Sequence, residues 1–185
     1  WAIEKDLHLP KPKADTGKKI AVIGGGPAGL SAAFHLRKRG HAVTIFEKNK
    51  KLGGMMRYGI PSYRTPRDMV DAEINRILDI GVEAKTDTRI GTDISLEQVE
   101  KDFDAIIVVS APFFVQKARV LNRPGMTKSK FDFIIKQQLS DKCKCKKADY
   151  IIKSGLGRHN TMLAIKKIML NINSASKKLV PIDQY

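Results

Sequence analysis

A G-x-G-x-x-G motif that begins at Gly24 constrains the fold of this chain more than any other feature. The apolar run before it, KKIAVIGG at 18–25, is typical of a buried parallel strand. Pro27 stands where a helix can begin, and Gly40 marks the expected end of that helix. A second apolar run, HAVTIFEK at 41–48, completes a unit of about 30 residues. The sequence therefore predicts a strand–helix–strand crossover whose first junction is rich in glycine.

The spacing of the three glycines suits a dinucleotide-binding turn. Gly24 would make the tight turn, Gly26 would let the backbone approach a pyrophosphate, and Gly29 would let the helix pack closely on the strand. Pro27 and Ala28 open the helix, whose N-terminal amides would face the phosphates. A glycine turn with only a structural role is the alternative.

A carboxylate ends the second predicted strand. Glu47 lies 23 residues after Gly24, where an acidic side chain can accept a hydrogen bond from a ribose 2′-OH and would repel a 2′-phosphate. A solvated acid at the strand end is the alternative. Lys48 follows directly and joins the candidate site, with a solvated lysine as its alternative.

Strands and helices alternate along the whole chain, which indicates a parallel sheet covered on both sides. Thr65 is the expected N-cap of one helix, and Ser95 with Gln98 forms the capping box of another. Right-handed crossovers predict the spatial order third-second-first-fourth-fifth. We therefore expect one α/β domain, a doubly wound and mainly parallel five-stranded Rossmann-like sheet with helices on both faces. The expected strands are 19–24, 42–47, 82–85, 104–109 and 149–153, and the later helices are 112–122, 127–140 and one that follows 157.

Composition excludes several classes of protein. No apolar run approaches the ~18 residues of a membrane span, and the N-terminus lacks the apolar core of a secretory signal. Two cysteines, Cys143 and Cys145, are too few for a disulfide framework and indicate a reducing, cytoplasmic setting. They also lack the second ligand pair of a structural zinc site. We therefore expect no membrane partner and no metal.

Charge is distributed unevenly along the chain. The net charge is +15, and residues 111–185 hold 16 Lys and Arg against 4 Asp and Glu. A basic tail of this kind attracts phosphates or nucleic acid. No recognition motif or aromatic cluster accompanies the charge, so we do not expect nucleic-acid binding.

Residues 18–109 resemble the FAD-binding domain of the glutamate synthase small-subunit family and of its relative, the flavin domain of dihydropyrimidine dehydrogenase. The segments that carry the resemblance are VIGGGPAGLSAA, VTIFEK, LGGMMRYGIPSYRTP and IGTDISLE. It implies FAD as the cofactor, with the ADP half on the first glycine motif.

The second glycine segment, LGGMMRYGIP, is where the resemblance implies contact with the rest of the cofactor. It places Gly53 and Gly54 beside the diphosphate and flavin, and brings Met55, Arg57 and Tyr58 toward the flavin ring. Surface charge is the alternative for Arg57, and core packing is the alternative for Met55.

Residues 104–170 resemble the C-terminal part of dephospho-CoA kinase, in DAIIVVSAPFFVQKARVLNRPGMT, IIKQQL and KKADYIIKSGLG. Arg119 and Arg123 match basic positions near the nucleotide in that family, with a solvated helix face as the alternative. The chain has no G-x-x-x-x-G-K-[ST] loop to hold β- and γ-phosphates, so we expect no kinase activity.

The two resemblances and the charge change meet near residue 110, which indicates a hybrid of two α/β proteins whose origin stays open. They divide the chain into an extended lead-in (1–17), a FAD-binding portion (18–110), a kinase-like portion that completes the same sheet (111–175) and a tail (176–185).

The expected function is an FAD-binding module that resembles part of an NAD(P)H-linked flavoprotein oxidoreductase and is incomplete for catalysis alone. NAD(P)H would bind only where a partner, such as a larger oxidoreductase subunit, or a further C-terminal domain supplies its site. Whether the chain is an enzyme by itself stays open. The alternatives are a recombinant or non-catalytic α/β scaffold, and a dephospho-CoA kinase-like nucleotide-binding protein without its P-loop.

Overall fold

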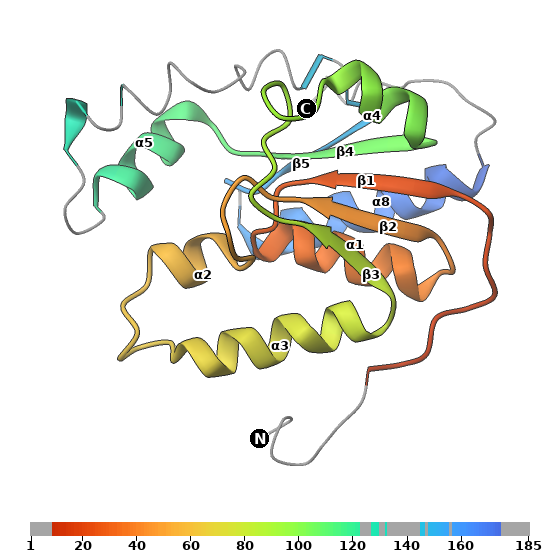
Figure 1. The fold of residues 1–185 in the computed structure, drawn as a ribbon, viewed down its shortest axis with the longest axis horizontal. Helices are drawn as coiled ribbons and strands as arrows, with labels where there is room; N and C mark the ends of the chain where they lie inside the picture. Colours follow the sequence, from red (N-terminus) through yellow and green to blue (C-terminus); the bar gives the residue numbers. More distant parts are fainter. Residues whose placement is uncertain are drawn as a thin grey trace.

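Five parallel strands form one sheet in the order β3-β2-β1-β4-β5. The structure is a computed structural model, and it describes residues 9–122, 127–129, 132, 145–146, 148–155 and 157–174. The order confirms the predicted doubly wound α/β sheet, including the place of the fifth strand beside the fourth. The strands are β1 (Lys19–Ile23), β2 (Ala42–Phe46), β3 (Val82–Lys85), β4 (Ala105–Ser110) and β5 (Tyr150–Lys153) (Figure 1).

Helices cover both faces of this sheet (Figure 1). Three helices, α1, α3 and α8, pack against one face, and α4 packs against the other. Within the described ranges, no helix combines the length and the hydropathy needed to cross a bilayer. The helices are α1 (Pro27–Lys38), α2 (Gly54–Tyr58), α3 (Arg67–Asp79), α4 (Leu96–Asp102), α5 (Phe113–Leu121) and α8 (Arg158–Ser174).

Alternate residues of β1 supply the two halves of the hydrophobic core. Ile20 and Val22 join the cluster under α1, α3 and α8, while Ala21 joins the cluster under α4. Both faces of the central strands are therefore buried, which explains their nearly continuous apolar sequence. The helical spacing of Met162, Ile165, Met169 and Ile172 predicts an apolar face on the last helix, and this face is confirmed, because Ile165 and Met169 are buried against the same core.

Two local predictions differ from the structure. Pro66, and not Thr65, occupies the N-cap of α3, and no side chain among the described residues caps that helix. The glycines of residues 50–64, after β2, predict a loop, but this segment contains the short helix α2. The capping prediction for α4 is confirmed, since the Ser95 hydroxyl accepts a hydrogen bond from the Gln98 amide at 3.1 Å. Most of the helix expected at 127–140, together with Arg123 and Cys143, lies outside the described residues.

The segment before β1 packs on the C-terminal end of α1. The Thr16 amide donates to the Gly40 carbonyl at 3.1 Å, and the Thr16 hydroxyl lies 2.6 Å from Nδ1 of the buried His41. The His41 Nε2 atom has no hydrogen-bond partner among the described residues. Burial lowers the pKa of His41, and Lys18 and Arg39 lower it further, whereas Asp15 opposes them.

Acid should therefore destabilise the fold. A histidine whose pKa is lower in the native state than its usual value of about 6.5 contributes stability above that pH, and the contribution is lost as the pH falls below it. The pKa of His35 is also lowered, mainly by burial. We expect a lower free energy of unfolding in urea at pH 5.5 than at pH 7.5, and a smaller difference in His41→Gln. Equal pH dependence of the free energy of unfolding in the two proteins would show that His41 does not cause the loss of stability in acid.

Candidate dinucleotide-binding site

The glycine motif forms the turn between β1 and α1, at the carboxyl edge of the sheet. The Gly24 amide donates to the Phe46 carbonyl at 2.9 Å, and Gly24 has a φ of +116°, which favours glycine. A Cβ on Gly29 would overlap the carbonyl oxygen of Gly24. The first and third glycines of the motif are thus required by the turn and by the close packing of α1 on it.

Gly26 is different, because its surroundings are open. Its φ of −79° and ψ of −178° suit any residue, and a Cβ there would have Gly54 Cα, at 3.9 Å, as its nearest neighbour. Among the described residues, no side chain caps the N-terminus of α1 at this position. The first amides of this 12-residue helix therefore have no capping side chain, and the residue at the N-cap has no side chain of its own.

The structure brings the two glycine segments together. The Gly53 amide donates to the Gly25 carbonyl at 2.8 Å. A Cβ on Gly54 would come within 2.8 Å of Gly26 Cα, and both Gly53 and Gly54 have positive φ. The second segment thus lies against the first, next to the N-terminus of α1.

Glu47 is buried at the end of β2 and is 6% exposed. Its Oε2 accepts a hydrogen bond from the Gly25 amide at 2.8 Å, and its Oε1 accepts from the amide and the side chain of Asn49 at 2.9 and 2.6 Å. The alternative of a solvated acid is therefore wrong for Glu47. A contact with a ribose stays a prediction, while Lys48 beside it is exposed.

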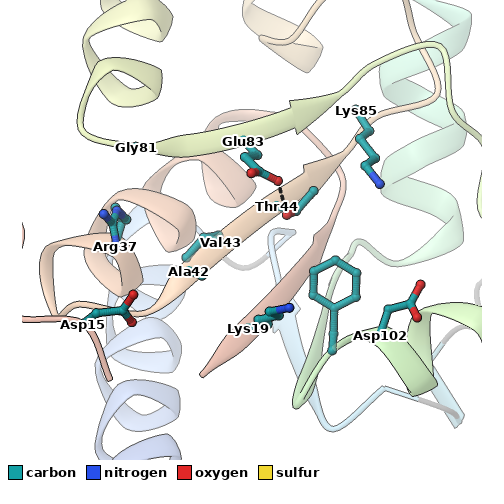
Figure 2. A pocket seen from close by; sticks show the side chains of 11 residues that line it. Asp15, Lys19, Arg37, Ala42, Val43, Thr44, Gly81, Glu83, Lys85 and Asp102 are labelled. Carbon is teal, nitrogen blue, oxygen red and sulfur yellow. Dashed lines mark hydrogen bonds between the residues drawn. The ribbon is translucent and has the colours of Figure 1, made fainter. Parts of the chain in front are cut away.

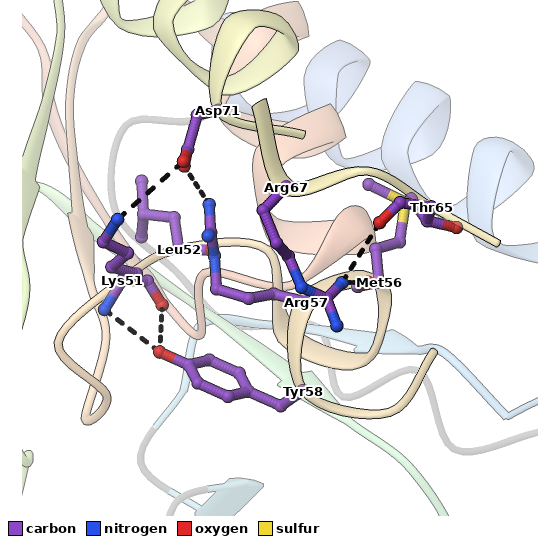
Figure 3. Close-up of polar contacts among 8 residues, drawn as sticks. All are labelled: Lys51, Leu52, Met56, Arg57, Tyr58, Thr65, Arg67 and Asp71. Carbon is purple, nitrogen blue, oxygen red and sulfur yellow. Dashed lines mark hydrogen bonds and ion pairs between the residues drawn. The ribbon is translucent and has the colours of Figure 1, made fainter. Parts of the chain in front are cut away.

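Figure 3 shows the polar contacts of the segment around α2. Arg57 is buried, its Nε donates to the Leu52 carbonyl at 2.6 Å, and its Nη2 pairs with Asp71 on α3. The alternative of a surface charge is thus wrong for Arg57. The exposed Tyr58 has its hydroxyl 3.2 Å from both the amide and the carbonyl of Lys51.

Two charged residues of this segment were missed in the sequence. Asp71 follows the buried Val70 on α3, and its hydrogen bond to Arg57 holds the pKa of its carboxyl below the usual value. Arg67 donates to the carbonyls of Met56 at 2.9 Å and Ile60 at 2.6 Å. The sequence did contain a signal for the ion pair: Asp71 stands next to an apolar position of a predicted helix, and the basic Arg57 precedes that helix.

A separate cavity of about 380 Å³ lies among β1, β2, β3 and the end of α4 (Figure 2). The Thr44 hydroxyl donates to Glu83 at 3.1 Å in its wall. None of the glycines of the motif lines this cavity. Its charged lining is balanced, with three basic and three acidic residues: Lys19, Arg37, Lys85, Asp15, Glu83 and Asp102. Over the described part of the chain there is no group of three metal-ligating side chains.

A parallel sheet of this order, with a glycine turn opening onto a helix N-terminus beside its central strand, defines a Rossmann-like dinucleotide-binding fold. Residues 22–82 match the family model of the NAD(P)-binding Rossmann-like domain. This match begins at Val22 near the end of β1, runs through α1, β2, α2 and α3, and ends at the first residue of β3.

Curated relatives include subunits of several oxidoreductases. The chain is 50% identical over 95 residues to the NADP(+)-dependent formate dehydrogenase subunit beta of Moorella thermoacetica, covering 51% of this chain and 13% of the relative. It is 40% identical over 110 residues to the glutamate synthase [NADPH] small chain of Bacillus subtilis, covering 60% and 22%. It is 36% identical over 121 residues to the NAD-dependent dihydropyrimidine dehydrogenase subunit PreT of Salmonella typhimurium, covering 62% and 29%.

Solved structures with a similar arrangement include FprA from Mycobacterium tuberculosis in complex with NADPH, at 19% identity and a TM-score of 0.46, over 51% of this chain and 22% of that one. Histamine dehydrogenase from Rhizobium sp. 4-9 has 27% identity and a TM-score of 0.44, over 57% and 16%.

The chain thus holds part of a dinucleotide-binding domain related to the glutamate synthase small chains, and it spans less than a third of the length of these three curated relatives. None of these matches supports the kinase-like prediction for residues 104–170 or the hybrid that it implied.

Proposed function

We propose that this chain binds FAD through its ADP half, as a module of an NAD(P)H-linked flavoprotein oxidoreductase. The observation that carries the proposal is the open, uncapped N-terminus of α1 at Gly26, with Gly54 facing it at the same edge of the sheet. Backbone amides and the helix dipole favour a diphosphate there. Gly24, Pro27, Ala28 and Gly29 would complete the turn that holds it.

The rest of the cofactor would extend toward α2. Gly53 and Gly54 would lie beside the diphosphate, and Met55 and Tyr58 would approach the flavin ring, as the resemblance implies. Glu47 would face the adenosine ribose, with the exposed Lys48 at the rim. Because the Glu47 carboxylate contacts the Gly25 amide, a 2′-phosphate would meet a negative charge.

Binding can be tested with a set of nucleotides that share the ADP group. The purified chain should show a flavin spectrum or gain one with FAD, and FAD, ADP and NAD should each raise its melting temperature. NADP should have the smallest effect of the four. A chain with no flavin spectrum and no thermal shift with any of them would refute the proposal.

Catalysis should need more than this chain. Hydride transfer requires a nicotinamide held against the flavin, and such positioning can supply roughly 7–11 kcal/mol of the barrier. The sequence has one G-x-G-x-x-G motif, so a partner subunit or a further domain would supply the second nucleotide site. We expect the FAD-loaded chain to oxidise NAD(P)H no faster than free FAD does in a spectrophotometric assay at 340 nm, a wavelength where reduced nicotinamide absorbs. Steady oxidation well above that rate would contradict this expectation.

A further inference from the structure

Among the residues that the structure describes, Arg57 is the one arginine or lysine that is buried, with 8% exposed. Burying a guanidinium is costly unless its donors are paired, so its partners indicate why it is there. Both described partners belong to the protein: the Leu52 carbonyl and the Asp71 carboxylate. The side chain is therefore engaged inside the fold, between α2 and α3 (Figure 3).

These contacts form a continuous path from α3 to the glycine turn. Asp71 on α3 holds Arg57, and Arg57 donates to the Leu52 carbonyl at 2.6 Å. The next residue, Gly53, donates its amide to the Gly25 carbonyl at 2.8 Å. The peptide group between Leu52 and Gly53 is thus held from both sides. Its carbonyl, from Leu52, accepts from Arg57, and its amide, from Gly53, donates to Gly25.

Arg57 also fills the space beside Gly53. A Cβ on Gly53 would lie 3.2 Å from Arg57 Cβ and 3.4 Å from both Val70 and Ile74 on α3. Gly54, the following residue, faces Gly26 at near contact. Arg57 therefore sets where the second glycine segment lies relative to the first.

We propose that Arg57 and Asp71 form a brace that positions Gly53 and Gly54 for the diphosphate, so that Arg57 is a positioning residue and does not touch the flavin ring. The proposal rests on the proposed function, because it assigns a role within the same site. It predicts that loss of the brace lowers the affinity for every ligand with an ADP group by the same factor. A residue at the flavin ring would instead affect FAD and leave ADP unchanged.

The test compares the affinities of ADP and FAD, measured by titration calorimetry well below the melting temperature of each protein. Arg57→Met and Asp71→Asn should each weaken both ligands by about tenfold, because the diphosphate loses a positioned partner. The double variant should be no weaker than either single one, since the two residues act as one unit. Arg57→Lys should be intermediate, because an ammonium cannot reproduce both guanidinium bonds.

The matched control is Arg64→Met, which removes an exposed arginine from the same segment and should leave both affinities unchanged. Asp71 is exposed enough, at 40% of its side chain, for its variant to fold even where Arg57→Met does not. Loss of FAD affinity with ADP affinity unchanged would overturn the brace and place Arg57 at the flavin. Lower melting temperatures with both affinities unchanged would also overturn it. If the unaltered chain binds neither ligand, the proposed function itself fails.

Discussion

Gly26→Ala should lose dinucleotide binding while keeping the fold. The backbone angles at Gly26 suit alanine, and the new Cβ would make only an ordinary contact, 3.9 Å from Gly54 Cα. The methyl group would nevertheless stand at the N-terminus of α1, where the proposed diphosphate must come close to the backbone. We expect the affinity for ADP and FAD to fall about a hundredfold, or ~2.7 kcal/mol, in a calorimetric titration.

The same variant carries its own control, because its stability should stay the same or rise slightly while its affinity falls. Alanine restricts the unfolded chain, which adds about 0.4–1 kcal/mol where the native backbone accepts it. The midpoint of urea unfolding should therefore stay the same or rise slightly. Unchanged affinity in a folded Gly26→Ala protein would count against the diphosphate site.

Gly29→Ala should have the largest effect on stability. Its Cβ would overlap the Gly24 carbonyl oxygen and come within 3.0 Å of the Gly24 carbonyl carbon, so backbone and not a flexible side chain would have to move. Both residues belong to the junction of β1 and α1, which is held by the core. We expect a loss of about 3–5 kcal/mol in the free energy of unfolding.

The comparison for Gly29→Ala is Ser31→Ala, two residues further along α1. Within the described residues, the one side-chain contact of the Ser31 hydroxyl is to Met162 Sδ at 3.7 Å, so its removal should change the free energy of unfolding by less than about 0.5 kcal/mol. A Gly29→Ala protein as stable as the Ser31→Ala protein would show that α1 can shift away from the turn.

The sheet could be predicted from the sequence because its signals are local. Apolar runs such as 18–25 and 41–48 mark buried strands, and the right-handed crossover then fixes their neighbours. Ser95 and Gln98 marked the start of α4 for the same reason, since a cap depends on residues three apart. The strand order, the all-parallel pairing and this cap are confirmed.

The contacts around α2 could not be predicted because they depend on residues far apart in the sequence. Arg57 is buried only because α3 presents Asp71 to it, 14 residues later. Glu47 is not solvated because the turn 22 residues earlier presents the Gly25 amide to it. The five-residue helix α2 is too short for a periodic apolar pattern.

The central position of β1 also bears on the rate at which the chain folds. Pairing with β2 brings Lys19 to Ala42 through a short loop, whereas pairing with β4 brings Ile20 to Ala105 through a much longer one. Loop closure costs more entropy as the loop lengthens, and non-local pairing slows folding. From these loop lengths we expect the unit that holds the glycine turn and the N-terminus of α1 to close first. A ligand that already binds this unit in the folding transition state should therefore speed folding, because it acts before β4 and β5 join the sheet.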